Sequence, residues 1–514
     1  MDWFKLLNKL SESAALDSSN KGLEREALRF VKGGRMALSS HPEAFGSALC
    51  HSSITTDFSE ALLELVTPTF DKSDDLMHFL SNLHYFIHKN LPEGENLWSS
   101  SMPCALVDDI PIAEYGPSGA GEFRKVYRRG LSYRYGKKMQ TIAGLHFNFS
   151  PSEDFWANLS KIKESENNKD FRSQHYFSLL RNFRSYNWFV NYLFGSSPAF
   201  HESFSELVDS KLKEKIGHET FCMPEAVSVR MSDAGYTTSR QGNLNISVNT
   251  LEEYTEGLQK AVTEADEQWA KLPKVDDEGP TQLTDNFLQA EFEYYSTIRP
   301  KPNPKNPRRP LVALKQDGVE YIEVRTLDIN PFEPLGICKA QIDFMEVFLY
   351  YLMCKESSPE TDKSRECSRD NLMRVTVQGR KKGLRLRCPQ NDEFDLQKAC
   401  TRIFYDLKKT AAILDKSRQT SDFSQSITEI EKRLSNPELL PSNRVIQALE
   451  NESFLGLTEI LSEQHQQSFK NFGADADLQK AFQEASTLSL EKQKEVESEG
   501  PDYTTYLKQF LSMD

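Results

Sequence analysis

The stretch that decides the fold is TIAGLHFNFS, residues 141 to 150, in which polar and apolar side chains alternate. The polar side chains are His146, Asn148 and Ser150. The apolar side chains between them are Leu145, Phe147 and Phe149. Because successive side chains of a β-strand point to opposite faces, such a strand buries one face and offers liganding groups on the other. The stretch therefore predicts a strand in a sheet with one polar face.

Three other segments repeat this alternation and place charged groups on one face. They are GLEREALRF (22–30) with Glu24 and Glu26, VSVRMSD (227–233) with Arg230, and VEYIEVRTLD (319–328) with Glu323 and Arg325. One such segment alone is typical of the solvated face of an antiparallel sheet. Four together predict an α+β domain, in which an antiparallel sheet carries helices on its other face.

The composition of the polar face indicates metal binding. Glu24, Glu26, His146 and Glu323 are short, strongly liganding groups. Several carboxylates held close together need cations or raised pKa values to coexist. Carboxylates with one imidazole suit Mg²⁺ or Mn²⁺, and Mg²⁺ with few protein ligands completes its shell with phosphates and water. We therefore expect Mg²⁺, with Mn²⁺ as a possible substitute, and ATP.

The segment SSITTDFSEALLELVTP, residues 52 to 68, adds further acidic candidates. Asp57, Glu60 and Glu64 fit one helical face, whereas Glu60 and Glu64 with Leu62 fit one strand face. The closing Thr67-Pro68 favours a strand that ends there. Asp57 and Glu64 are candidate ligands, and Glu60 is either a ligand or a solvated side chain.

Phosphate binding is assigned to metals and arginines, because the chain has neither a GxxxxGK[ST] loop nor a GxGxxG turn. Arg325 could neutralise charge on a transferring phosphoryl group, and Arg230 is better suited to hold a carboxylate. For each, an ion pair with a neighbouring Glu is the alternative. The tyrosines near these strands could line a pocket or fill the core.

Composition excludes several classes of function. The 514 residues carry 62 basic and 76 acidic side chains, a net charge of −14, without a long basic run, so nucleic acid is not expected as a partner. No apolar run approaches the ~20 residues of a membrane span, and the N-terminus reads as an amphipathic helix. We expect a cytoplasmic protein with eight reduced cysteines.

The chain divides near residue 340. We expect a catalytic α+β domain over 1–340 and a helical region over 341–514 packed on it, because apolar residues from Leu396 to Leu414 recur at helical spacing. The polar segment 355–369 is expected to be a loop. A second expected loop, KPNPKNPRRP at 301–310, lies between two predicted strands, and we hypothesise that it closes over the nucleotide.

Eight segments occur in an order that resembles the glutamate–cysteine ligase (γ-glutamylcysteine synthetase) family of the proteobacterial type. They are GLEREALRF (22–30), residues 41–68, SMPC (101–104), QTIAGLHFNFS (140–150), YLFGSSPA (192–199), VRMSDAGYT (229–237), TIRPK (297–301) and GVEYIEVRTLDINPFEP (318–334). The resemblance covers roughly residues 15 to 350. The helices after it are similar to the family only in pattern and length.

The resemblance implies a glutamine synthetase-like fold, with a concave sheet face as the active site. The implied reaction joins the γ-carboxylate of L-glutamate to the amine of L-cysteine at the expense of ATP, through a γ-glutamyl phosphate. This is the first step of glutathione biosynthesis. The implied partners are these small molecules, and the chain is expected to be a monomer.

The resemblance also assigns roles residue by residue. The implied metal ligands are Glu24, Glu26, Asp57, Glu64, His146 and Glu323. Arg325 and Asn148 match positions near the nucleotide phosphates, and Arg325 and Glu323 are the implied catalytic residues. Positions near the amino-acid substrates are Tyr127, Arg128, Arg230, Tyr236 and Tyr295. The alternatives are a ligase of the same fold that takes another amine, a metal-dependent phosphohydrolase, and a non-catalytic binding protein.

Overall fold

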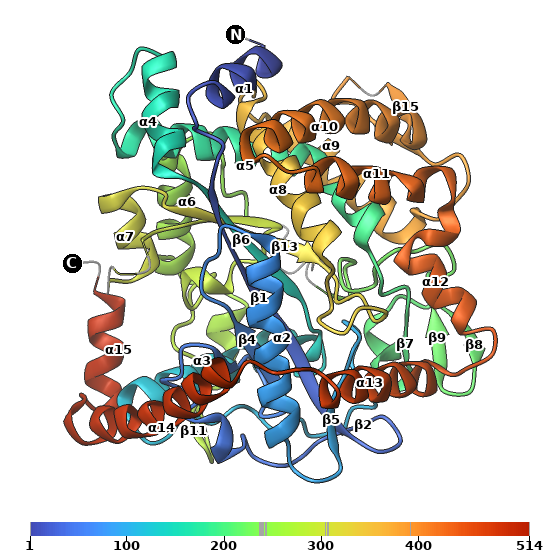
Figure 1. Ribbon diagram of the computed structural model, residues 1–514. Helices are drawn as coiled ribbons and strands as arrows, with labels where there is room; N and C mark the ends of the chain where they lie inside the picture. The colour runs from blue at the N-terminus through green and yellow to red at the C-terminus, as the bar shows by residue number, and fades with distance from the viewer. Residues whose placement is uncertain are drawn as a thin grey trace.

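The computed structural model describes residues 2–235, 241, 244–303, 305, 308–390 and 392–512. At its centre lies an antiparallel sheet in which six strands follow the order β12-β13-β6-β1-β4-β3 (Figure 1). In that order they are Ile298–Lys301, Tyr321–Leu327, Leu145–Pro151, Ser19–Val31, Leu62–Val66 and Ile54–Thr56. Two short strands, β2 (Arg35–Met36) and β5 (Glu95–Leu97), also pair with β1. The predicted antiparallel sheet is confirmed.

Alternation divides the sheet into two faces, as the sequence predicts. Leu23, Phe147 and Val324 are fully buried on the apolar face. Helices α5 (Lys169–Phe194) and α8 (Lys339–Cys354) cover this face: α5 contacts β12 and β13, and the ring of Tyr350 in α8 lies 5.2 Å from that of Phe149. The polar side chains of β1, β6 and β13 point away from these helices.

The remaining elements before residue 340 surround the sheet. The helices are α1 (Trp3–Ser11), α2 (Ser73–Asn90), α3 (Gly119–Tyr135), α4 (Glu153–Ile162), α6 (Leu251–Thr263) and α7 (Pro310–Asp317). A small sheet contains β7 (Ala199–His201), β9 (Thr220–Cys222) and β8 (Glu214–Gly217), and β10 (Val275–Asp276) pairs with β11 (Gly279–Pro280). The N-terminal helix is the amphipathic helix that the sequence predicts.

Beyond residue 340 the chain is mainly helical, as predicted. The helices after α8 are α9 (Asp362–Gln378), α10 (Leu396–Arg418), α11 (Asp422–Ser435), α12 (Pro441–Ala448), α13 (Phe454–Lys470), α14 (Ala476–Glu499) and α15 (Tyr503–Leu511). A hairpin of β14 (Arg385–Arg387) and β15 (Glu393–Asp395) interrupts them. Helices α13 and α14 contact α2, and α15 contacts α3, so the C-terminal helices return to the first half of the chain (Figure 1). The division into two domains stays a prediction.

The predicted strand at 227–233 is wrong. This segment forms turns, and only Ser228 makes an isolated bridge, to Ser197. Both alternating sets of side chains are buried, including Ser228 and Arg230, so neither face is solvated. The Ser228 hydroxyl donates to Asp328 and accepts from the Met231 amide, which bends the backbone locally.

Two loop predictions also need correction. Residues 362–369 belong to α9, because Thr361 and Ser364 form a capping box that starts the helix. The segment 301–310 is expected to join two strands, but it runs from the last residue of β12, Lys301, to the first residue of helix α7, Pro310. Proline at the first helical position favours a helix start. Pro304, Asn306 and Pro307 of this segment lie outside the described residues.

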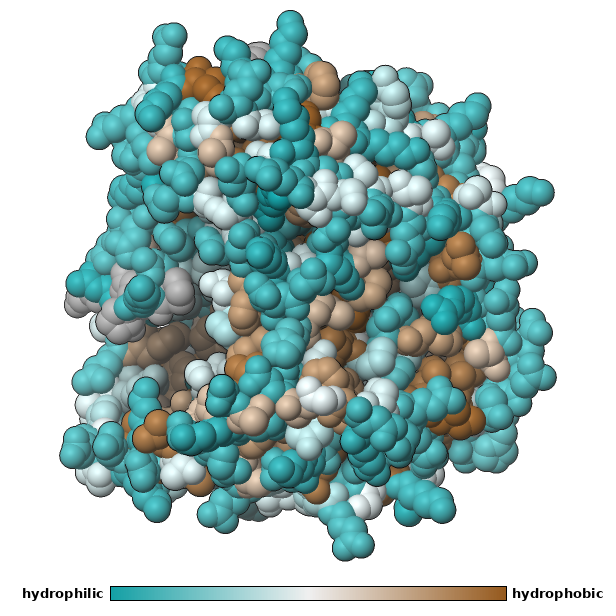
Figure 2. Space-filling view, viewed as in Figure 1, coloured by the Kyte–Doolittle hydropathy of each residue, from teal (hydrophilic) through white to brown (hydrophobic). Residues whose placement is uncertain are grey.

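The face of the molecule in Figure 2 is mostly hydrophilic, with scattered hydrophobic patches. Within the described ranges, every helix is too short or too polar to cross a membrane.

Candidate active site

Three neighbouring strands bring the predicted liganding groups together on the polar sheet face. In the register, Glu24 of β1 is opposite His146 of β6, and Asn148 of β6 is opposite Glu323 of β13. Ligand atoms of Glu24, His146 and Glu323 all lie within 4.8 Å of one another. A single cation could therefore reach all three.

Direct contacts fix the positions of these side chains. Glu24 Oε2 lies 3.0 Å from His146 Nδ1, and Glu24 Oε1 accepts a hydrogen bond of 2.9 Å from the Asn148 amide. Glu323 Oε1 lies 3.0 Å from Lys301 Nζ, and Glu323 Oε2 lies 3.0 Å from Arg325 Nη1. Neighbouring protein groups thus orient the carboxylates and the imidazole.

A second acidic group lies beside the first. Glu26 of β1 is opposite Glu64 of β4, and Glu26 Oε1 lies 3.6 Å from His146 Nε2. Asp57 follows β3 at the same end of the sheet, and its charge acts on both Glu26 and Glu64. Glu60 lies apart: its carboxylate accepts from the Glu114 amide at 3.4 Å.

Bringing these acidic groups together shifts their pKa values in different directions. Burial, followed by the charge of Asp57, raises the pKa of Glu26 to about 8. Burial and the charges of Glu24 and Asp57 raise the pKa of Glu64 well above its usual value. By contrast, burial alone would raise the pKa of Glu323, but the charges of Lys301 and Arg325 outweigh it and hold that pKa well below the usual range.

The donor set fits a divalent cation. Burial and the charge of Arg325 lower the pKa of His146, so the imidazole is neutral at pH 7, and its Nε2 is a buried atom without a hydrogen-bond partner. A neutral imidazole nitrogen facing carboxylate oxygens is a common metal-binding arrangement. A cation would also neutralise the carboxyl groups whose pKa values are raised.

The predicted arginines occupy different environments. Arg325 borders the acidic group and lies 3.0 Å from Glu323. Arg230 is fully buried behind it, where its Nη2 donates to the Arg325 carbonyl at 2.8 Å and its Nη1 lies 3.6 Å from Asp328 Oδ1. Arg128 donates to the backbone carbonyls of Thr56 and Asp57. Its guanidinium therefore lies at the acidic end of β3 and β4.

The tyrosines lie at the same end of the sheet. Tyr295 receives a 3.0 Å hydrogen bond from the Gln140 side-chain amide, and Tyr127 packs edge-on against Phe292 with ring centroids 4.6 Å apart. Burial, followed by the charge of Glu293, raises the pKa of the Tyr127 hydroxyl well above its usual value, and the charge of Arg128 acts in the opposite direction. Tyr236 lies outside the described residues.

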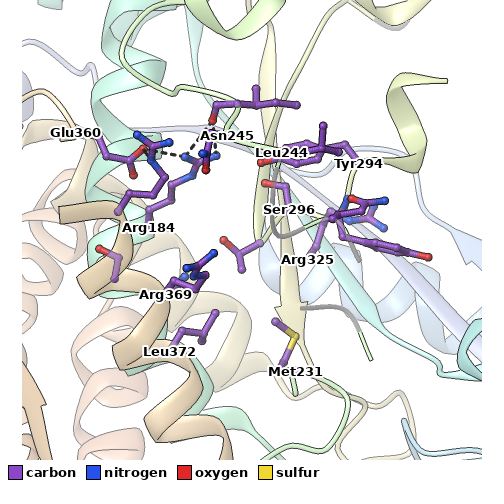
Figure 3. A pocket seen from close by; sticks show the side chains of 17 residues that line it. Arg184, Met231, Leu244, Asn245, Tyr294, Ser296, Arg325, Glu360, Arg369 and Leu372 are labelled. Carbon is purple, nitrogen blue, oxygen red and sulfur yellow. Dashed lines mark hydrogen bonds and ion pairs between the residues drawn. The ribbon is translucent and has the colours of Figure 1, made fainter. Parts of the chain in front are cut away.

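A cavity of about 180 Å³ opens beside Arg325 and Tyr295. Arg325 borders it from β13, and Arg369 and Leu372 border it from α9 (Figure 3). Arg184 lines it and is paired with Glu360 at 3.1 Å. The acidic face thus has an adjoining space lined by positive charge.

Sequence reasoning placed Lys301 in the loop 301–310 and missed Arg299. Both belong to β12, the edge strand beside β13, and Arg299 is opposite Glu323 in the register. Because Arg299 and Lys301 are two residues apart in TIRPK, the same alternation rule could have placed them on the polar face. Lys301 matters most, since it pairs directly with Glu323.

Comparisons with known proteins agree with one another. The family model described as glutamate-cysteine ligase matches residues 4–375. A glutamate–cysteine ligase of Shewanella pealeana is 42% identical over 508 residues and one of Hahella chejuensis 39% over 506 residues, each covering at least 96% of both chains. The crystal structure of a Francisella tularensis glutamate–cysteine ligase in complex with AMP has a TM-score of 0.90 and 31% identity, covering 96% of this chain and 97% of that one.

Proposed function

Because the chain belongs to the glutamate–cysteine ligase family, we propose that the acidic face of its sheet is the catalytic site of that reaction. The enzyme uses ATP to join L-glutamate to L-cysteine, giving γ-glutamylcysteine, the first step of glutathione biosynthesis. The observation that carries the site proposal is the convergence of Glu24, His146 and Glu323 from three strands.

Glu24, His146 and Glu323 would hold one Mg²⁺, and Glu26, Glu64 and Asp57 would complete the acidic set. Mn²⁺ would serve the same donors. When bound, the metal would supply positive charge to phosphate oxygens. The donor set supports this proposal because carboxylate oxygens with one imidazole match the preferences of these ions.

The residues of the chain would act mainly by positioning and electrostatics. A free carboxylate is a poor acyl donor, because its oxide leaving group is strongly basic. Phosphorylation of the γ-carboxylate replaces that leaving group with phosphate. Arg325 would stabilise the charge of the transferring phosphoryl group, since its guanidinium is always protonated and already lies at the acidic face. Asn148 would contribute an amide beside the phosphates.

The amino acids would lie toward Asp57 and Tyr295. Arg128 and the buried Arg230 provide positive charge at that end, and Tyr127 and Tyr295 provide aromatic surface with hydroxyl groups. Tyr236 is proposed from the family resemblance alone. The cysteine amine then attacks the γ-glutamyl phosphate, forming the amide bond and releasing phosphate.

Phosphate release from ATP tests this function. The assay is run with glutamate alone, with cysteine alone and with both amino acids. A ligase of this specificity requires both for sustained release, and one that takes another amine would respond to a different acceptor. A phosphohydrolase would release phosphate with neither, and that result would overturn the proposal.

A further inference from the structure

The C-terminal helix α15 reaches the proposed active site through one side chain. The Phe510 ring lies 4.6 Å from the Phe123 ring of α3 and 6.3 Å from the ring of Phe292. Phe292 in turn packs edge-on against Tyr127 at 4.6 Å. A chain of aromatic contacts therefore runs from the last helix to a residue proposed to contact the amino-acid substrates.

Phe510 also contacts Arg309, which in turn binds Glu291 beside Phe292. The Arg309 guanidinium stacks over the Phe510 ring at 4.6 Å and donates to the Phe510 carbonyl at 3.1 Å. The same guanidinium makes two parallel bonds, of 2.8 and 2.9 Å, to the carboxylate of Glu291. Such a bidentate pair is geometrically demanding, and here both side chains are about 95% buried.

The contact of Phe510 with Phe292 and the pairing of Arg309 with Glu291 both involve one short turn. Glu291 and Phe292 belong to the 3-10 turn η6 (Glu291–Glu293), which leads directly into Tyr294 and Tyr295. The buried Glu293 is held from the other side by Arg134 and Tyr135. Phe510 and Arg309 thus hold the start of η6 through Glu291 and Phe292, four and three residues before Tyr295. Arg134 and Tyr135 hold its last residue, Glu293, independently of α15.

Helix α15 contributes little to the core. Its described residues include none that is buried, and its apolar side chains pack on Phe123 and Val126 of α3 in a small cluster of their own. Loss of its contacts should therefore leave the sheet and its acidic group in place.

We propose that α15 is a positioning element, in which Phe510 holds η6 and so sets the positions of Tyr127 and Tyr295 for amino-acid binding. The inference rests on the proposed function, because it assigns these two tyrosines to the substrates. Loss of the Phe510 contacts should therefore weaken the binding of an amino acid but not of ATP, because the groups proposed for ATP lie on the strands rather than on η6.

The test is the kinetics of Phe510→Ala in the full-length chain. We expect KM for glutamate or cysteine to rise, with a loss of about 3- to 100-fold in kcat/KM for that amino acid, as small displacements of positioning groups produce. KM for ATP should stay unchanged. Phe510→Leu should restore part of the loss, and Arg309→Lys, which keeps the charge but loses the paired bonds to Glu291, should act in the same direction. Lys508→Ala, on the exposed side of α15, is the matched control.

The KM values for the amino acids and for ATP distinguish a positioning role of α15 from a purely structural one. If Phe510→Ala leaves KM for both amino acids at the wild-type values, or raises KM for ATP to the same degree, α15 is only a structural cap and the inference fails. A lower melting temperature with unchanged KM values has the same meaning. Failure of the proposed function itself would be seen in the wild-type enzyme, as phosphate release that does not require the amino acids.

Discussion

Glu323→Gln removes one charge from the acidic group while keeping the shape of the side chain. Glu323 is 1% exposed and pairs with Lys301 and Arg325, each at 3.0 Å. Removing one partner from a buried, hydrogen-bonded charge pair costs about 2–5 kcal/mol in binding. If that loss falls on the metal, its affinity drops about 30-fold to a few thousandfold. We therefore expect turnover to fall to about a quarter of the wild-type value or less at a metal concentration of about ten times the wild-type Kd.

The fold should survive this change. Leaving Lys301 and Arg325, whose side chains are 30% and 13% exposed, without their carboxylate costs at most about 3–5 kcal/mol, and relief of the repulsion between Glu323 and Glu24 offsets part of it. Unfolding entropies of about 2.1 cal/mol/K per residue, over 514 residues, give about 1.1 kcal/mol/K. A net loss of about 2–4 kcal/mol therefore lowers the melting temperature by only about 2–4 °C.

Two assays are needed for this prediction. Phosphate release is followed with ATP, glutamate and cysteine over a range of Mg²⁺ concentrations, and thermal unfolding is followed by circular dichroism with and without Mg²⁺. Glu320→Gln is the matched control, because Glu320 is exposed and directly precedes β13. Wild-type turnover in Glu323→Gln, or an equal loss in Glu320→Gln, would contradict a metal-binding role for Glu323.

Three further predictions concern residues around the site and the stability of the fold. A Cβ on Gly144 would lie 2.2 Å from Arg230 Nη2, so Gly144→Ala should lower the free energy of unfolding by about 1–3 kcal/mol; an unchanged urea midpoint would contradict this. Tyr295→Phe loses the bond with Gln140 and should raise KM for an amino acid about two- to tenfold but not KM for ATP, and equal KM values would argue against its assigned place. Burial lowers the pKa of both His41 and His51 to about 4, below their value near 6.5 in the unfolded chain. The contribution of these two histidines to stability should therefore be constant above pH 6.5 and fall between pH 6.5 and 4, where the unfolded chain takes up protons that the native state does not; in urea titrations the difference in stability between the wild type and His41→Gln should decrease across that window, and a difference independent of pH would count against it.

Alternation along a strand was sufficient to find Glu24, His146 and Glu323, because side-chain direction in a strand is set by the backbone. The same rule failed at 227–233, where burial of both faces and the bonds of Ser228 produce turns instead. Arg25 shows another limit: alternation places it with Leu23 and Ala27 on the apolar face, but does not predict that a charged side chain is only 2% exposed there.

Contacts between distant parts of the chain could not be predicted. The pairing of Lys301 with Glu323 depends on which strand lies at the edge of the sheet, and the stacking of Arg309 on Phe510 joins residues about 200 positions apart. Neither follows from local periodicity, because both depend on topology. For Tyr127 and Arg128, the family resemblance was the source of the prediction, since spacing alone could not separate pocket from core.

In the proposed site, acidic side chains from separate strands converge to hold a cation against the terminal phosphates of ATP. The most direct test is a crystal structure with Mn²⁺ and a non-hydrolysable ATP analogue, in which anomalous scattering locates the metal. We expect a peak within about 2–2.5 Å of oxygen or nitrogen atoms of Glu24, His146 and Glu323, and next to a phosphate oxygen. A metal bound elsewhere, or phosphates bound away from this face, would contradict it.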